Sequence, residues 1–435
     1  MNAKRAICLI IVLTLLCGLM TGCFDKKEVD ELGYVIAMGL DKGKNNYLRL
    51  TFQIAKPEAG GEEGGGGGGP NSSSVTVETP TIYSGINMVN TFVSKQLNLS
   101  HNKLVVFSEE LAKEGVEPYL HPLLRGREFR PSVHMVVSKC SAEEYLNNVQ
   151  PELALKPSKF YELAFQSYSY TGLIPNVQFH DFYMDSESLC KDPVAVLGGV
   201  GRFKSSDEFD VDNSTFRERG RNTPVGGDFF GGDIPKVGGI KAENMGVAVF
   251  SGDKMVGEMD GTDSKYLLLA TGDYGHAYWS LKDPKEEDKY ILLDIKQSRR
   301  PNHKVTLVDG KPQIDVKIVL EADVLAIQST IDYEQGELTD FLEKYVEELI
   351  REEMIRFLQK TSKEFGADIC GFGRYAKKYF LTWEEWEKYG WKSRYKDATF
   401  NVDVNFKLRR PGLILKTFPS TDMEYVEELK NANNK

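Results

Sequence analysis

Cysteine is scarce in this sequence, and its spacing argues against both a disulfide framework and a zinc site. The six cysteines are Cys8, Cys17, Cys23, Cys140, Cys190 and Cys370. No pair has the C-x-x-C spacing of a structural zinc site, and the last three lie too far apart to staple a small secreted fold. We expect Cys140, Cys190 and Cys370 to be small residues of a hydrophobic core.

Motifs that carry catalytic chemistry are also missing. The sequence has no HExxH, GxSxG or Walker motif, so it indicates no metalloprotease, nucleophile-elbow hydrolase or phosphate loop. The histidines stand far apart, at His101, His121, His134, His180, His276 and His303. His134 falls within a strand pattern and is interpreted as structural, and a base at His101 would lack an identifiable nucleophile. We therefore predict no catalytic residue, no cofactor and no metal.

Acidic residues form two patterns that suggest a site, and both have a simpler structural explanation. The glutamates of residues 347–353 fall within a predicted helix and are interpreted as its solvated face. The stretch DVDNS at residues 210–214 resembles the start of a calcium loop. However, Thr215 stands where that loop needs glycine, and Arg221 stands where it needs a bidentate glutamate.

An excess of basic residues is absent as well. The chain has 54 Lys and Arg against 64 Asp and Glu, which gives a net charge of −10 at pH 7. An acidic surface argues against nucleic-acid binding and against broad electrostatic adhesion to anionic lipid. The chain is nevertheless 41% hydrophobic and 11% aromatic, which indicates a folded protein with a sizeable core.

The most hydrophobic stretch is short and stands at the N-terminus. Lys4 and Arg5 precede an apolar run over residues 6–20, and two small residues, Thr21 and Gly22, follow that run. About fifteen apolar residues fall short of the roughly 20 that span a bilayer as a helix. The order of charged, apolar and small residues is that of a secretory signal peptide, which we predict for residues 1–22.

Cys23 directly follows those small residues, an arrangement that resembles a lipobox. At such a motif the thiol receives a diacylglyceryl group, and cleavage makes the lipidated cysteine the mature N-terminus. Cys17 is a poorer acceptor because Leu16 precedes it where a small residue is needed. Two acyl chains hold a protein stably on a membrane, so we predict lipid attachment at Cys23. An uncleaved anchor and secretion with a free Cys23 are the alternatives.

The mature chain is long enough for two or three domains. Removing residues 1–22 from 435 leaves 413. Residues 23–200 mix strand and helix patterns and predict an N-terminal α+β domain, in which the glycine run at 60–70 is a flexible insertion. The expected strands cover 34–40, 48–54, 103–107 and 132–139. The expected helices cover 81–97 and 109–115, and a third helix is expected to begin after Ser141.

A second glycine-rich segment, residues 201–242, is predicted as a flexible domain boundary. Residues 243–417 predict a C-terminal α+β region of one or two subdomains, and residues 418–435 are expected to form a tail. The expected elements are hairpins turning at 251–253 and 309–310, a helix over 337–364, a capping box at Thr382 and a strand over 400–408. The predicted fold class is therefore α+β: two to three mixed α/β domains with largely antiparallel sheets and a long amphipathic helix in the C-terminal part.

Four segments of the chain, in the order in which they occur, resemble the Ger(x)C family. Its members are the lipoprotein C subunits of nutrient germinant receptors in endospore-forming bacteria. The four segments cover residues 22–42, 101–146, 244–272 and 367–391. The residues that match the family pattern in the last two are Gly246, Phe250, Gly257, Asp368, Gly371 and Gly373. The chain departs from the family at Phe24, where Trp is usual, and in its two glycine-rich segments.

The resemblance implies a function, a location and partners. In the family, the C subunit is lipid-anchored on the outer face of the spore inner membrane. It works with an A subunit and an integral, transporter-like B subunit, and its three mixed α+β domains hold no established catalytic site. The expected function is thus a non-enzymatic receptor subunit, needed for assembly and signalling in spore germination.

Two other classes of protein could carry the same kind of leader. A solute-binding lipoprotein of a transporter would show repeated βαβ units in two lobes, against which the long hairpins and the late helix argue. A cell-envelope hydrolase would need a nucleophile and a base that converge only in the fold. Aromatic residues near Phe129–Val133 and Trp383–Trp391 are candidate partner surfaces, although burial in the core is their simpler interpretation.

Overall fold

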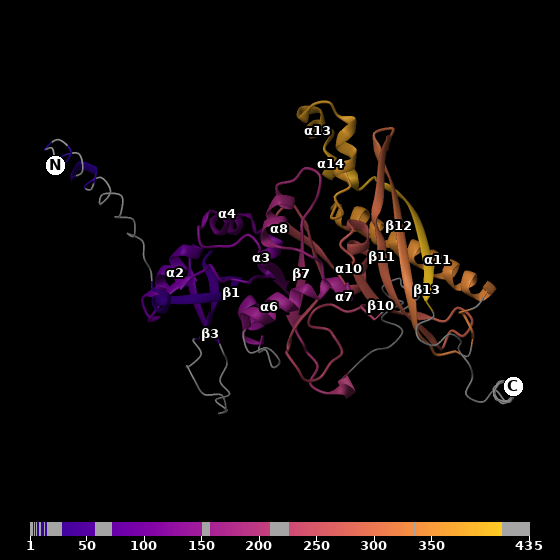
Figure 1. Cartoon of the computed structure of the whole chain (residues 1–435), viewed down its shortest axis with the longest axis horizontal. Helices are drawn as coiled ribbons and strands as arrows, with labels where there is room; N and C mark the ends of the chain where they lie inside the picture. Colours follow the sequence, from indigo (N-terminus) through magenta and orange to yellow (C-terminus); the bar gives the residue numbers. More distant parts are fainter. Residues whose placement is uncertain are drawn as a thin grey trace.

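Two β-sheets follow one another along the long axis of the molecule, and helices pack against both (Figure 1). This computed structural model confirms the predicted α+β class with more than one domain. The described residues are 28–56, 72–149, 157–208, 226–329, 331–334 and 336–410, with Ala3, Arg5, Ile7, Ile10–Val12 and Thr14 near the start. None of the helices within these ranges is long and apolar enough to cross a membrane.

The elements of the first half alternate strands and short helices. Its strands are β1 (Leu32–Lys42), β2 (Leu48–Ala55), β3 (Ser72–Thr79), β4 (Gln96–Asn98), β5 (Leu104–Ser108), β6 (His134–Ser138) and β7 (Val194–Val200). Its helices are α2 (Ile82–Asn90), α3 (Glu109–Glu114), α4 (Glu117–Arg125), α5 (Ala142–Asn147), α6 (Pro157–Gln166), α7 (Tyr168–Thr171) and α8 (Phe179–Ser186).

The elements of the second half are longer. Its strands are β8 (Ala242–Ser251), β9 (Lys254–Met259), β10 (His276–Lys282), β11 (Tyr290–Val308), β12 (Lys311–Ile327) and β13 (Thr399–Arg410). Its helices are α10 (Gly261–Thr271), α11 (Gly336–Gln359) with a π-helical end (Lys360–Phe365), α12 (Gly373–Ala376), α13 (Trp383–Tyr389) and α14 (Trp391–Tyr395).

The larger sheet is antiparallel at both edges and parallel at its centre. Its order is β3-β2-β1-β5-β6-β7-β8-β9, with β4 beside β1. The pairs β1–β5, β5–β6 and β6–β7 are parallel, whereas β1–β2, β2–β3, β7–β8 and β8–β9 are antiparallel. The central strands are continuous apolar runs such as Leu104–Phe107, as expected of strands that are covered on both faces. One face packs against α5 and α6, and the other belongs to the main hydrophobic core.

The large sheet continues across the segment 201–242. Strands β7 and β8, which flank this segment, are direct antiparallel neighbours. Within the described part of the segment, the Gly231 N–H donates to the Met245 carbonyl at 2.9 Å, and the Gly232 N–H donates to Glu243 Oε2 at 2.8 Å. Residues 231–234 therefore pack against β8. The domain boundaries that the sequence suggests stay a prediction.

The smaller sheet has the order β10-β11-β12-β13 and is built on one long hairpin. Asp309 and Gly310 turn that hairpin with φ angles of 50° and 73°, which agrees with the predicted type I′ turn. Along β12 the side chains alternate between buried and exposed, so one face of the sheet contacts the core. Helix α11 packs against β13, and the two cross in Figure 1.

Two predicted features of the helices need correction. The helix expected over residues 81–97 ends at Asn90, because residues 96–98 pair with the start of β1 as strand β4. Of the α11 glutamates expected on a solvated face, Glu347 instead contacts protein: its Oε1 accepts the Phe406 N–H at 2.9 Å, and one turn earlier Glu343 Oε1 accepts the Leu408 N–H at 2.9 Å. These two glutamates satisfy backbone donors of β13, the edge strand of the sheet. Glu348 and Glu352 are exposed, as predicted.

Candidate functional site

The predicted lipid-attachment residue, Cys23, lies outside the described residues, as do most of the leader and the glycine run at 60–70. The described body begins at Glu28 with one turn of 3-10 helix, Val29–Glu31, and β1 follows directly. Lys95 Nζ donates to the Asp30 carbonyl at 2.8 Å, and β4 pairs with the first three residues of β1. The folded body therefore extends to within five residues of Cys23.

Asp368, one of the residues matching the Ger(x)C pattern, is fully buried at the junction of the two halves. Its Oδ1 accepts the N–H groups of Gly371 at 2.8 Å and Phe372 at 3.1 Å. Its Oδ2 accepts the Gly373 N–H and the Trp391 indole N–H, both at 2.9 Å. One carboxylate thereby fixes the conformation of the loop before α12 and its packing against α14.

Asp192, just before β7, connects this loop to the large sheet. Its Oδ2 accepts the Asp368 N–H at 3.0 Å, and its own N–H donates to the Asp368 carbonyl at 2.9 Å. Its Oδ1 accepts the Gly252 N–H at 3.1 Å and pairs with Lys392 Nζ at 2.9 Å. Asp192 has no exposed surface, so its charge is balanced within the protein by Lys392 and by backbone dipoles.

The two glycines that match the family pattern in this loop, Gly371 and Gly373, stand where a side chain would not fit. Gly371 adopts a φ of +76°, a conformation that favours glycine. A Cβ on Gly373 would lie 2.7 Å from both the Cys190 carbonyl oxygen and the Trp391 indole nitrogen. The loop can therefore wrap around the Asp368 carboxylate only if both positions lack a side chain.

His303, on β11, packs against this loop and the helix that follows it. Its ring contacts Phe372 and Tyr375 edge-on, with centroid distances of 5.2 Å to each, and both of its nitrogens are buried. Burial lowers the pKa of His303 to about 4, so the ring is neutral at pH 7. We refer to Asp192, Asp368 and His303 as the buried junction.

The residues of the buried junction have a structural role. Burial raises the pKa of Asp368 to about 6, and its N–H donors oppose that rise. Both carboxylate oxygens already accept two N–H groups each, so neither is free to take a proton from a substrate. Sequence reasoning identified Asp368 through its resemblance and missed Asp192; the available signal was an aspartate placed immediately before a buried apolar strand.

The other histidines and the cysteines that sequence reasoning considered also have structural surroundings. His134 stacks on Phe165 at 4.6 Å, with its Nδ1 3.3 Å from the Val177 carbonyl oxygen, as a structural histidine would. Cys370 is buried as expected, whereas Cys140 and Cys190 are half-buried, and all three are free thiols. Burial raises the pKa of each thiol, which disfavours the nucleophilic thiolate.

The two candidate partner surfaces differ in exposure. Phe129 and Val133 are 6% and 1% exposed, so this segment belongs to the core. In the second segment Trp386 and Trp391 are buried as well. Only Trp383 remains half exposed there, and its indole N–H donates to Glu387 at 2.5 Å.

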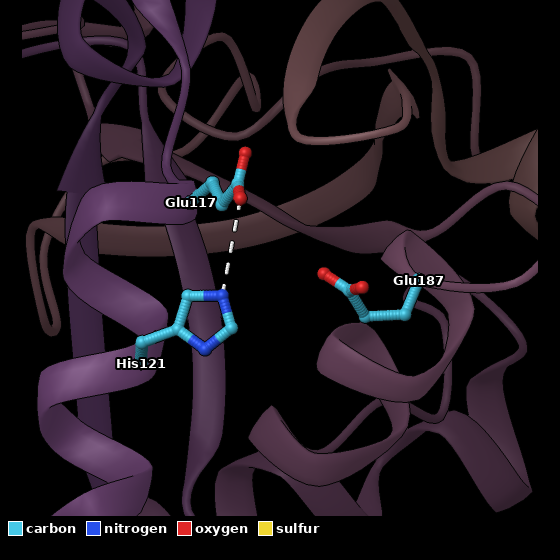
Figure 2. A group of neighbouring side chains, drawn as sticks. All are labelled: Glu117, His121 and Glu187. Atoms are coloured by element: carbon cyan, nitrogen blue, oxygen red, sulfur yellow. Dashed lines mark ion pairs between the residues drawn. The ribbon is translucent and has the colours of Figure 1, made fainter.

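A cluster that sequence reasoning did not predict lies on the surface between α4 and the end of α8. Glu117 and His121 stand one turn apart on α4, and Glu187 follows α8 (Figure 2). One ligand atom from each of the three lies within 4.8 Å of the others, and His121 Nε2 is 3.9 Å from Glu117 Oε1. One imidazole and two carboxylates form a donor set that zinc accepts. We call these residues the exposed cluster.

Neighbouring residues do not hold the imidazole and the two carboxylates of the exposed cluster in the geometry of a metal site. Both glutamates are exposed, and the His121 ring meets Tyr183 only edge-on at 5.5 Å. Within the described ranges, no hydrogen bond from another residue orients the imidazole or either carboxylate, whereas protein metal sites usually have such second partners. Next to His121, an open groove of about 610 Å³ runs between α2 and α4, lined by Tyr83, His121, Pro122, Arg125 and Gly126.

Comparison with protein families gives matches on both halves of the chain. Residues 25–198 match the family described as "Spore germination protein N-terminal domain", and residues 245–412 match "Spore germination B3/ GerAC like, C-terminal". The chain belongs to the GerAC-like spore germination family. The Ger(x)C resemblance in the sequence is thereby confirmed.

Relatives of known name match over almost their entire length. The protein YfkR of Bacillus subtilis (strain 168) is 23% identical over 422 residues, covering 95% of this chain and 99% of that protein. Spore germination protein KC of the same organism is 24% identical, covering 93% of this chain and 96% of KC. Spore germination protein GerQC of Bacillus cereus is 21% identical, covering 93% of this chain and 98% of GerQC.

Among solved structures, the crystal structure of the GerBC protein is similar, with a TM-score of 0.47 and 15% identity. The match covers 88% of this chain and 99% of GerBC. In this GerAC-like chain, the buried junction links the two parts that the family matches define: Asp192 lies in the first part, and Gly252 and Asp368 lie in the second.

Proposed function

We propose that this chain is a lipid-anchored, non-enzymatic subunit of a nutrient germinant receptor. It is held through acyl chains on Cys23 at the outer face of the spore inner membrane, where it assembles with integral-membrane A and B subunits. The observation that carries this proposal is the family match over both halves of the chain, behind a leader that ends in a lipobox-like cysteine.

The most highly organised polar group in the described fold also favours a non-enzymatic role. The carboxylates of Asp192 and Asp368 accept backbone and indole N–H groups and hold the two halves together. A receptor subunit needs such a rigid connection, because it has to transmit contacts between partners without local unfolding. The larger sheet, which runs without a break from β3 to β9 and includes strands of both halves, also differs from the two separate βαβ lobes expected of a solute-binding lipoprotein.

Replacement of Cys23 tests the anchor. In spores of an endospore former that carries this chain, Cys23→Ala is expected to release the protein from the membrane fraction and to slow the nutrient-triggered loss of optical density. Cys17→Ala is the matched control, since it also removes a leader cysteine but leaves Cys23 in place. Normal germination with parental amounts of the Cys23→Ala protein would overturn the proposal.

Assembly is tested separately by co-purification. The tagged full-length chain, solubilised in mild detergent from spore membranes, is expected to bring down integral-membrane A and B subunits. If it is recovered without them at parental expression levels, the receptor role fails. Calorimetric binding of one small nutrient by the isolated chain would instead favour a solute-binding lipoprotein.

A further inference from the structure

Helix α2 and the turn after it carry almost no charge, although they lie on the surface. The 21 residues Pro80–Ser100 contain one charged side chain, Lys95, in a chain of which 27% of residues are charged. Met88 is 45% exposed and Phe92 is 60% exposed. A helix face in water normally carries charged or strongly polar residues, so this face is unusual for an acidic protein.

The exposed apolar residues are held in a fixed position. On the inner side of α2, Ile82 and Val89 are buried, and a Cβ on Gly85 would lie 2.6 Å from Leu50 Cδ1. The Thr81 hydroxyl caps the helix by accepting the Ser84 N–H. Close packing on β2 therefore fixes which face of α2 points outward, and Met88 lies on that face.

This face lies beside the point where the N-terminal chain joins the body. Lys95 Nζ donates to the Asp30 carbonyl, and the Asn90 side chain accepts the Leu97 N–H at 2.9 Å. These contacts place the turn Thr91–Lys95 against the start of β1. In Figure 1, α2 lies at the same end of the molecule as the beginning of β1.

The chain between the lipid and the body is short. Four residues, 24–27, lie between Cys23 and Glu28, and the five fully extended Cα–Cα steps from one to the other span about 18 Å. Acyl chains on Cys23 would thus keep this end of the body within about 18 Å of the membrane surface. Of the chain's exposed side chains, those next to this connection are the ones that reach the lipid most easily.

We propose that Met88 and Phe92, with Lys95 beside them, form a membrane-contacting edge that lies at the level of the lipid headgroups. This inference rests on the lipid anchoring proposed above and adds an orientation to it. Apolar side chains on a surface helix can insert among headgroups, and a lone lysine is compatible with anionic lipid. The segment Pro80–Ser100 itself adds no acidic residue that this surface would repel.

The test measures the polarity around residue 92 when the lipidated full-length chain is bound to protein-free vesicles of phosphatidylethanolamine and phosphatidylglycerol. Phe92→Cys carries an environment-sensitive fluorophore, in a chain whose half-buried Cys140 and Cys190 are replaced by serine. Tyr278→Cys is the matched control: Tyr278 is 59% exposed and lies on β10 of the other sheet. Both labelled chains should keep the parental thermal unfolding transition.

The expected result is a blue shift of the probe at position 92 and its quenching by lipids brominated near the headgroup, with neither effect at position 278. If the fluorophore emits as it does in water at both positions, the proposed membrane-contacting edge is wrong. Quenching that appears only after A and B subunits are added would also overturn it, and would assign the face to a protein partner.

Mass spectrometry of the N-terminal peptide separates this outcome from failure of the proposed anchoring. If Cys23 carries the diacylglyceryl group and the probe stays in water, the membrane edge is wrong and the anchor stands. If Cys23 carries no lipid, the anchor is wrong, and the membrane edge falls with it.

Discussion

Two groups of residues in this molecule each combine one histidine with two carboxylates, but they differ in almost every physical property. The buried junction of Asp192, Asp368 and His303 joins segments up to 176 residues apart, and backbone N–H groups meet both carboxylates. The exposed cluster of Glu117, His121 and Glu187 lies at two helix ends, with one ion-pair distance of 3.9 Å.

The difference shows that residue type alone does not indicate a site. In water, solvent satisfies the carboxylates and weakens their attraction to a cation, so an exposed pair contributes little to stability. In the interior, every charge has to be matched by protein groups, and removal of one partner is costly. We therefore expect substitutions in the two groups to have effects of very different size.

The largest effect is expected for Asp368→Asn. The new amide NH₂ group would face N–H donors in place of a carboxylate oxygen, and the variant should lose about 3–5 kcal/mol of unfolding free energy. Urea denaturation measures the change. Asp403→Asn is the control: its side chain is 62% exposed and pairs with Lys317 on the surface, so it should change stability by less than about 0.5 kcal/mol. Similar losses in both variants would contradict the comparison.

His303 should make stability depend on pH. Burial holds its folded pKa near 4, below the ordinary value of 6.5, so the unfolded chain binds the proton more readily between these values. Stability is then retained above pH 6.5 and lost as pH falls towards 4, by up to about 3 kcal/mol. His303→Leu should remove this part of the pH dependence. Parallel curves of unfolding free energy against pH for parent and variant would show that His303 contributes nothing.

A smaller loss is expected for Lys392→Met, which keeps the length of the side chain and removes the charge that faces Asp192. Because Lys392 is 28% exposed, water can replace part of the interaction, and we expect a loss of about 2 kcal/mol. Lys388→Met, on the exposed side of neighbouring α13, should be nearly neutral. The prediction is wrong if the two methionine variants unfold at the same urea concentration.

The smallest effect is expected in the exposed cluster. His121→Ala should change the unfolding free energy by less than about 0.5 kcal/mol, and micromolar zinc should not raise the melting temperature of the parent. A zinc-dependent rise in the parent that disappears in His121→Ala would instead make this cluster a metal site.

Local features of the fold could be predicted well from the sequence. The turn at Asp309-Gly310, the capping box of Thr382 and Glu385 and the end of the long helical segment at Gly366 all occur as expected. Each depends on residues within a few positions of one another. Covalent neighbours fix such features, so a short stretch of sequence contains all the necessary information.

Features that depend on distant pairing were less predictable. The helix expected to reach residue 97 ends at Asn90 because β1, more than fifty residues earlier, offers a strand edge to residues 96–98. The Glu347 side chain was expected in solvent and instead binds β13. In both cases, backbone groups of a distant element compete with the local pattern for hydrogen bonds.

The family, the order of its four characteristic segments and the local turns and caps can be predicted from the sequence, because these follow from residue identity and short spacing. Which polar groups are buried together, and which apolar groups remain outside, depends on how distant segments pack in the folded chain. Asp192 and Asp368 meet through packing of distant segments, and Phe92 stays exposed because the inner face of α2 is already covered by β2. Burial is a property of the whole fold, and no local pattern encodes it.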